Sequence, residues 1–288
     1  MKFPNVLLVI ILSFATAFVT ARYVLPHNGN EAVAVKESVY DRVMRTGTIR
    51  CGYADWNPLL IKDPNTGKLS GIAYDYVEAM GKALNLKVEW AEEVGWGDFP
   101  VALETGKIDA FCTGAWPTAS RARQVDFVRP IIYQAVYAYV RADDHRFDNN
   151  LAAIDDPTIA IAAMDGEMSS LIAASDFPKA KTTQVPQLAN ISELLLNVVD
   201  KKADVTFTDT DTAAQYDAKN PGKIRRVSSK APLRFLGDPL VIARGQDQLR
   251  RMFDIATDEL LSSGKIEKIT TKYERFPGTL LRVAPLYQ

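Results

Sequence analysis

Short apolar runs alternate with amphipathic segments along most of this chain. Short apolar runs between turn residues are typical of buried strands, whereas apolar residues spaced three and four apart are typical of helices. The first half therefore predicts the order βαβαβ, which implies a parallel sheet covered by helices. The predicted elements are a strand at 49–53, a helix over 76–85, a strand at 88–90, a helix over 99–104 and a strand at 108–112.

The second half repeats this plan, and residues 106–113 parallel residues 201–208 position by position. Ligands of open α/β sheets bind beyond the carboxyl ends of the strands. Two such lobes would therefore place residues 113–121 opposite residues 208–211 across a cleft. The predicted elements are a strand at 159–164, a helix near 171–174, a strand at 182–185, a helix over 191–199 and a strand at 203–208, and then a strand at 240–243 and helices over 249–261 and 266–273 that return to the first lobe.

The amino terminus has the pattern of an export segment. Lys2 precedes an apolar run over residues 6–19, and residues 15–17 and 19–21 both fit the small-x-small pattern of signal-peptidase sites. We expect residues 1–21 to be either a cleaved signal peptide or an uncleaved membrane anchor. For an anchor the apolar run is short, because a full membrane span needs about 20 apolar residues. Residues 22–46 are predicted to be a spacer.

Composition and charge exclude several classes of function. The 288 residues are 47% hydrophobic with a net charge of -1, so we expect a folded protein that binds neither nucleic acid nor anionic lipid. The two histidines, His27 and His145, do not have metal-ligand spacing, and no cofactor or catalytic motif occurs. We therefore expect no metal, no cofactor and no enzymatic activity. Cys51 and Cys112 lie in predicted buried strands, where they could form a disulfide or remain two neighbouring thiols.

Arg121 is the first candidate for ligand binding. Thr118 is predicted to cap a helix with Arg121 in its first turn, where the helix dipole disfavours a cation by roughly a few tenths of a kcal/mol. An anion at this position would explain the arginine, because a guanidinium and the backbone N–H groups of residues 113–116 can bind a carboxylate together. The alternative is a surface arginine, solvated or paired with an acid.

Asp209 and several further residues are candidates on the same reasoning. Asp209 ends the equivalent strand of the second lobe, where it could bind an ammonium group or cap the helix that follows, a role that Asp211 would fill equally well. Glu167, in the loop after that lobe's first strand, could face the cleft or the solvent. The aromatic candidates could be pocket walls or core residues; they are Trp56, Trp96, Trp116 and Tyr133.

These motifs together resemble the family 3 extracellular solute-binding proteins, the polar amino-acid receptors of ABC importers. Residues 67–75 are similar to the family's G-x-x-x-G-x-x-x-D opening of the first helix, and Lys272-Tyr273 is similar to its lysine-tyrosine ending. The block from Gly106 through Arg121 to Pro130 also resembles the family, so that the likeness runs from residue 47 to residue 274.

The resemblance implies the type II periplasmic-binding-protein fold: two α/β lobes, residues 47–133 plus 239–288 and residues 134–238, joined by a two-strand hinge with the ligand cleft between them. It implies a periplasmic receptor for a small amino acid, with an ABC permease of the inner membrane as partner, and we expect a monomer. The implied roles are Arg121 as carboxylate clamp, Gly114 and Trp116 as backbone donors, Thr113 as a cleft hydroxyl, Asp209 as ammonium ligand, and Trp56 and Trp96 as the aromatic pair around the ligand side chain.

Three departures from the family pattern bear on specificity. Glu167 and Met168 replace the usual hydroxylated residues of the second lobe, Trp116 replaces a small residue, and leucines follow Pro58 where an aromatic is usual. Two other functions remain as alternatives. One is a cyclohexadienyl dehydratase-like enzyme that acts on prephenate or arogenate, with Glu167 as its acid. The other is a membrane-anchored amino-acid sensor that retains residues 1–21.

Overall fold

The computed structural model describes residues 37–283. The predicted signal or anchor segment, His27 and most of the predicted spacer lie outside these residues, and so does the end of the chain from residue 284. Within the described part, no helix is long and apolar enough to cross a membrane.

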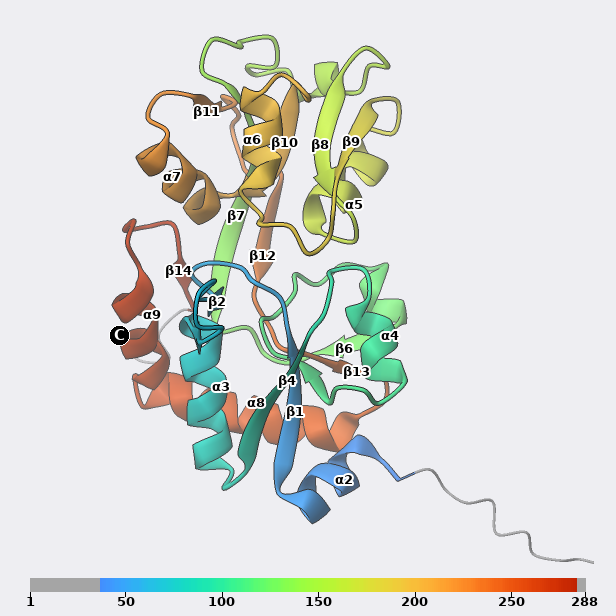
Figure 1. Cartoon of the computed structure of the whole chain (residues 1–288), viewed down its shortest axis with the longest axis vertical. Coiled ribbons are helices and arrows are strands. Elements are labelled where there is room, and N and C mark those ends of the chain that lie inside the picture. Colours follow the sequence, from blue (N-terminus) through green and yellow to red (C-terminus); the bar gives the residue numbers. More distant parts are fainter. Residues whose placement is uncertain (1–36, 284–288) are drawn as a thin grey trace, which may run out of the picture. The chain divides into compact units, whose positions relative to one another are not determined.

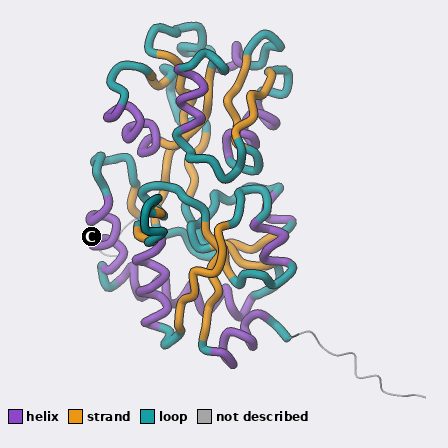
Figure 2. Tube along the Cα trace, viewed as in Figure 1, coloured by secondary structure: helices purple, strands orange, loops and turns teal. Residues whose placement is uncertain are grey.

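The prediction of two α/β lobes is confirmed (Figures 1 and 2). We call the part built around a five-stranded sheet lobe 1 and the part built around a seven-stranded sheet lobe 2. Lobe 1 contains α2 (Val39–Thr46), β1 (Thr48–Tyr53), β2 (Ile61–Lys62), β3 (Leu69–Ser70), α3 (Ile72–Ala83), β4 (Lys87–Glu93), α4 (Phe99–Glu104), β5 (Ala110–Phe111), η1 (Arg121–Arg123), β6 (Val125–Phe127), β13 (Val241–Ala243), α8 (Asp247–Ser262) and α9 (Lys265–Tyr273).

The sheet of lobe 2 continues into the connection between the lobes. Its strands β12 and β14 both pair with β7 near the point where the chain crosses between the lobes. The elements of this sheet and its helices are β7 (Ile132–Arg141), η2 (Leu151–Ile154), β8 (Ala160–Met164), α5 (Met168–Asp176), β9 (Lys181–Val185), α6 (Glu193–Val199), β10 (Val205–Asp209), α7 (Thr210–Lys219), β11 (Ile224–Arg226), β12 (Arg234–Gly237) and β14 (Leu281–Arg282).

Each sheet has a parallel core, as the βαβαβ order predicts. In lobe 1 the strand order is β4-β1-β5-β13-β6, with β1 parallel to both β4 and β5 and β13 antiparallel. In lobe 2 the order is β11-β7-β10-β8-β9, with β8 parallel to both neighbours and β7 antiparallel to β10. Strands β5 and β10 therefore occupy equivalent places and end at the cleft.

A two-strand hinge joins the lobes. The start of β7 pairs with β12 in the antiparallel register Tyr133↔Gly237 to Val136↔Arg234, and both strands run between the lobes in Figure 1. The short β14 adds a third strand by pairing with Ile132 and Tyr133. Tyr133 stacks on Phe235, with ring centroids 5.4 Å apart, so Tyr133 belongs to the hinge and does not line the cleft as proposed from the sequence.

The predicted spacer ends earlier than residue 46. Ser38 caps α2 by accepting a hydrogen bond from the Asp41 backbone N–H, and this helix belongs to the folded body. Arg42 of α2 pairs with the fully buried Asp109, and Arg50 of β1 joins it with an N–O distance of 2.9 Å. Paired charges are a condition for burying a carboxylate, so α2 helps to complete lobe 1.

The two ends of the family-like pattern meet in lobe 1. Asp75, in the first turn of α3, accepts hydrogen bonds from Lys272 Nζ at 2.7 Å and from the Tyr273 hydroxyl at 3.1 Å. Cys51 of β1 and Cys112, which follows β5, form a disulfide with Cα atoms 5.5 Å apart. Of the two alternatives that the sequence left open for these cysteines, the structure has the disulfide, between adjacent strands of one sheet.

Candidate functional site

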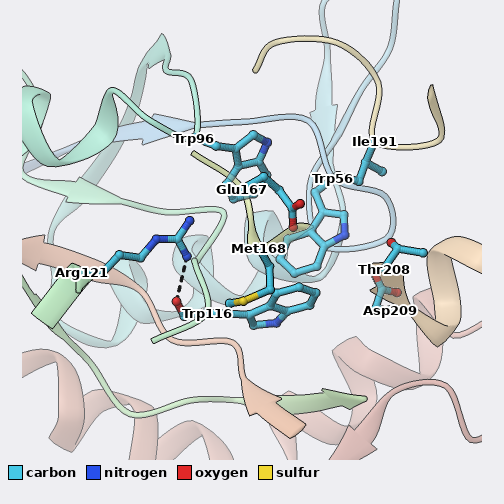
Figure 3. A pocket seen from close by; sticks show the side chains of 9 residues that line it. All are labelled: Trp56, Trp96, Trp116, Arg121, Glu167, Met168, Ile191, Thr208 and Asp209. Carbon is cyan, nitrogen blue, oxygen red and sulfur yellow. Dashed lines mark hydrogen bonds between the residues drawn. The ribbon is translucent and has the colours of Figure 1, made fainter. Parts of the chain in front are cut away.

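A small cavity lies between the two lobes (Figure 3). Lobe 1 contributes the tryptophans and the guanidinium, and lobe 2 contributes the carboxylates. Six of the eight predicted site residues line it together with three others. The lining residues are Trp56, Trp96, Trp116, Arg121, Glu167, Met168, Ile191, Thr208 and Asp209.

Arg121 connects the two lobes directly. It lies in the short 3₁₀ turn η1, a single tight turn in place of the predicted helix, with Ser120 and not Thr118 at its N-cap position. The Thr118 hydroxyl accepts from the Arg121 backbone N–H at 3.2 Å. One guanidinium nitrogen donates to Trp116 O at 2.8 Å and another to Gly166 O of lobe 2 at 2.6 Å. The solvated-surface alternative is wrong, because Arg121 is only 8% exposed.

The electrostatic environment of Arg121 is unusual for an arginine. Burial lowers the pKa of its guanidinium to about 10, and the negative charge of Glu167 partly opposes this shift. The guanidinium also lies 5.4 Å from the ring centroid of Phe99, within the usual range for a cation–π contact. Its two carbonyl bonds use only part of a five-donor fork, so donors remain for an anion.

Asp209 lies where both roles proposed for it are possible. It ends β10 and caps α7, where its carboxylate accepts from the Thr212 backbone N–H at 2.8 Å and from the Thr212 hydroxyl at 2.7 Å. It also lines the cavity and is 1% exposed. Burial raises the pKa of Asp209, and the charge of Asp211 adds to this, while the bonds from Thr212 lower it.

Glu167 faces the cavity and is not exposed to solvent, as it is 7% exposed. Its carboxylate caps α5 by accepting from Ser169 N at 2.7 Å and from the Ser169 hydroxyl at 2.6 Å. Burial raises its pKa, while the hydrogen bonds from Ser169 and the charge of Arg121 act in the opposite direction. A cavity carboxyl group thus stands on the lobe 2 side, across from the guanidinium.

Three tryptophans form the wall that lobe 1 contributes. Trp56 makes edge-to-face contacts with Trp96 and Trp116, with ring centroids 5.7 Å and 5.0 Å apart. In Figure 3, Trp56 and Trp116 lie between Arg121 on one side and Asp209 on the other. Because these rings are also buried in the core cluster, the pocket-wall and core interpretations are both correct for them.

Thr113 and Gly114 lie next to the site but do not line the cavity. The Thr113 hydroxyl, predicted as a cleft hydroxyl, accepts from Ala54 N at 2.9 Å and donates to Ala54 O at 2.8 Å, which connects the ends of β1 and β5. Gly114 has a positive φ of 88°, and a Cβ there would lie 2.9 Å from Pro239 O. Both residues therefore shape the loop that carries Trp116.

Sequence reasoning missed three residues that line the cavity as binding candidates: Met168, Ile191 and Thr208. Ile191 was assigned to a helix, but α6 begins at Glu193 and Ile191 lies in the preceding loop. Thr208 directly precedes Asp209 on β10 and belongs to residues 208–211, which the sequence predicts at the cleft, but it was not named as a ligand contact. The described residues contain no group of three or more histidine, cysteine or carboxylate side chains placed to hold a metal ion.

The structure shows the two lobes in contact around this cavity. Gln187 of lobe 2 accepts from Gly97 N at 2.8 Å and donates to the Asp98 carboxylate at 2.6 Å. Gln215 donates to Asn57 O at 2.9 Å on another side of the cleft. Two α/β lobes on a paired-strand hinge, closed over a cavity with opposite charges on its two sides, define a binding protein of the type II periplasmic fold.

The chain belongs to the bacterial extracellular solute-binding proteins, family 3, whose model matches residues 49–276. The probable amino-acid-binding protein YxeM of Bacillus subtilis is 23% identical in an alignment of 270 residues that covers 87% of this chain and 90% of YxeM. The L-arginine-binding protein of Pseudomonas aeruginosa is 24% identical in an alignment of 239 residues that covers 77% of this chain and 86% of that protein.

Solved structures support the same fold. The ancestral amino-acid-binding protein described as a precursor of cyclohexadienyl dehydratase is 28% identical, with a TM-score of 0.70 over 82% of this chain and 99% of that chain. The L-cysteine receptor of Neisseria gonorrhoeae has a TM-score of 0.71 at 17% identity, over 86% of this chain and 100% of the receptor, which is a likeness of fold.

Proposed function

We propose that this protein is an extracytoplasmic receptor that closes around an amino acid and delivers it to an ABC-type importer. The observation that carries the proposal is that Arg121 of lobe 1 and Asp209 of lobe 2 line one cavity. A carboxylate bound by Arg121 and an ammonium bound by Asp209 would be the two ends of one dipolar ligand. The names of the relatives, a probable amino-acid-binding protein and an L-arginine-binding protein, support the class of ligand.

Lobe closure would couple binding to delivery. A hinge that brings two lobes together around a ligand creates a joined surface that exists only in the bound state, and a permease can recognise that surface. The disulfide between Cys51 and Cys112 supports a location outside the cytoplasm, since disulfides persist in oxidising compartments. The export segment predicted at residues 1–21 supports the same location.

Calorimetry and thermal unfolding with a panel of amino acids test the proposal. A true ligand at 100 times its dissociation constant should add about 2.7 kcal/mol to the free energy of unfolding. Arg121→Ala should weaken binding about 30-fold or more, because truncating one member of a buried charge pair costs about 2–5 kcal/mol. Arg123→Ala, in the same turn but exposed, is the control and should leave affinity unchanged. Equal affinity of both variants would reject the assignment of Arg121.

One observation favours a second candidate, a cyclohexadienyl dehydratase-like enzyme. Glu167 lines the cavity with a raised pKa, as a general acid requires. The ancestral structural neighbour described as a precursor of such an enzyme points in the same direction. Turnover of prephenate or arogenate that disappears in Glu167→Gln would establish this activity, whereas binding of amino acids without turnover would leave the receptor as the function.

A further inference from the structure

Three buried polar groups near the hinge have no hydrogen-bond partner within the described part of the chain. They are the amide of Gln134, of which both the nitrogen and the oxygen are unpaired, the carboxylate of Asp238, of which both oxygens are unpaired, and the indole nitrogen of Trp116. Gln134 is fully buried and Asp238 is 4% exposed. Leaving such a group unpaired destabilises the fold, and more so when it is charged.

The register of the hinge places two of these groups on one face. Asp238 follows β12 and donates its backbone N–H to Ile132 O at 3.0 Å, so it stands opposite Ile132 of β7. Gln134 lies two residues further along β7, opposite Leu236. Side chains two apart on a strand share a face, and diagonal neighbours on paired strands are within reach of long side chains. We call Gln134, Asp238 and the Trp116 indole N–H the hinge cluster.

The hinge cluster shares Trp116 with the interlobe cavity, which Gln134 and Asp238 do not line. The Trp116 N–H faces the Asp238 carboxylate and favours its ionised form, although the two do not reach hydrogen-bond geometry. In Figure 3 the Trp116 nitrogen lies on the edge of the ring turned away from Met168 and Trp56. Burial raises the pKa of Asp238 well above its ordinary value, and the charge of Asp209, which lines the cavity, raises it further. Asp238 is therefore within electrostatic reach of the predicted ammonium site.

We propose that the hinge cluster is a second part of the ligand site, and that the ligand is an amino acid with a cationic side chain whose cation binds the Asp238 carboxylate and the Gln134 amide oxygen. This inference rests on the proposed function. A side-chain ammonium or guanidinium supplies the donors that these oxygens lack, and it supplies the charge that a buried carboxylate requires.

The balance of charge at the site supports a cation. Among the described residues, the cavity and the hinge cluster contain three carboxyl groups, those of Glu167, Asp209 and Asp238, against the one guanidinium of Arg121. A neutral zwitterion leaves this excess unchanged, whereas a ligand with an additional positive charge reduces it. The tryptophan wall also favours a cation, because indole faces attract positive charge.

Calorimetry with arginine and citrulline tests the proposal, because the two ligands have nearly the same shape and differ in side-chain charge. The protein should bind arginine at least 10-fold more tightly than citrulline. Asp238→Asn should bring this ratio close to one while it raises the stability of the unliganded protein, because an uncompensated buried charge is removed. Gln134→Met should also lower the affinity for arginine, and it should lower the affinity for citrulline by a smaller factor.

Asp144→Asn is the matched control. Asp144 is a buried carboxylate beyond the far end of β7, paired with Arg146, and its substitution should leave the ratio unchanged. Citrulline bound as tightly as arginine by the unmodified protein, or a ratio that persists in Asp238→Asn, would overturn the inference and leave the receptor function standing. Failure of every amino acid in the panel to bind would instead reject the proposed function and the inference with it.

Discussion

Gly166 lies where the backbones of the two lobes touch. Its φ is 69°, and a Cβ there would lie 2.3 Å from Gly97 N of lobe 1. The backbone strain of an alanine at positive φ, about 1–2 kcal/mol, affects lobe 2 alone. The clash with Gly97, in contrast, arises only when the lobes close, so Gly166→Ala should lower ligand affinity at least 10-fold by opposing closure.

Gly222→Ala separates these two effects. Gly222 is also in lobe 2 with a φ of 67°, but a Cβ there meets no atom within 4 Å. Both variants should lose similar stability, as measured by denaturant unfolding without ligand, whereas Gly166→Ala alone should lose affinity in calorimetry. If the two variants bind equally well, the contact between Gly166 and Gly97 is not needed for closure.

Individual residues show how far the sequence predicts this site. Arg121 and Asp209 follow strands whose order is predictable, so their meeting across a cleft follows from the order of the elements along the chain. Thr113 was predicted as a cleft hydroxyl, and its bonds to the backbone of Ala54, directly after β1, are a contact that chain order does not show. Asp238 was missed because its surroundings depend on the register of the hinge strands.

At the scale of elements, the disulfide reinforces a short strand pairing. Strand β5 pairs with β1 over only Cys51↔Ala110 and Gly52↔Phe111, and Cys112 follows directly. The bridge closes a loop with a sequence separation of 61 residues. We predict that reduction lowers the free energy of unfolding by about 2–4 kcal/mol, measured by denaturant titration of oxidised and reduced protein of the same sequence. Equal midpoints would show that the sheet does not depend on the bridge.

The pattern of apolar residues predicts which helices and strands exist better than it predicts where each one begins. The strands and helices around the cleft were predicted because they alternate between the two periodicities. Helix α2 was missed because many of its residues are polar and it buries only Val43. Its start did have a signal, since the Ser38 hydroxyl accepts from the Asp41 backbone N–H and donates to the Asp41 carboxylate. The cap, and not the hydrophobic period, marks the start of this helix.

At the scale of the molecule, the two ends of lobe 2 should respond to pH with opposite sign. At the outer end, hydrogen bonds from Arg146 lower the pKa of Asp144. The pKa of Asp204 is also lowered, because bonds from Ala160 and Arg146 outweigh burial. A carboxyl group whose folded pKa is lowered stabilises the fold above its unfolded pKa of about 3.9, and this stabilisation is lost as the pH falls.

At the cleft the sign is reversed. Burial raises the pKa of Glu167, so the folded protein binds its proton more tightly than the unfolded chain does. Such a group favours the fold below its unfolded pKa of about 4.3, and this contribution is lost as the pH rises through the folded value. We therefore expect two differences when the free energy of unfolding is measured from about pH 3 to pH 8. As the pH rises above about 4, the free energy should decline less in Glu167→Gln than in the unmodified protein. As the pH falls below about 4, it should decline less in Asp144→Asn than in the unmodified protein. Parallel curves of unfolding free energy against pH for both variants and the unmodified protein would contradict the opposite pH responses of the two ends of lobe 2. The ionised form of the cleft carboxyl group would then not oppose folding.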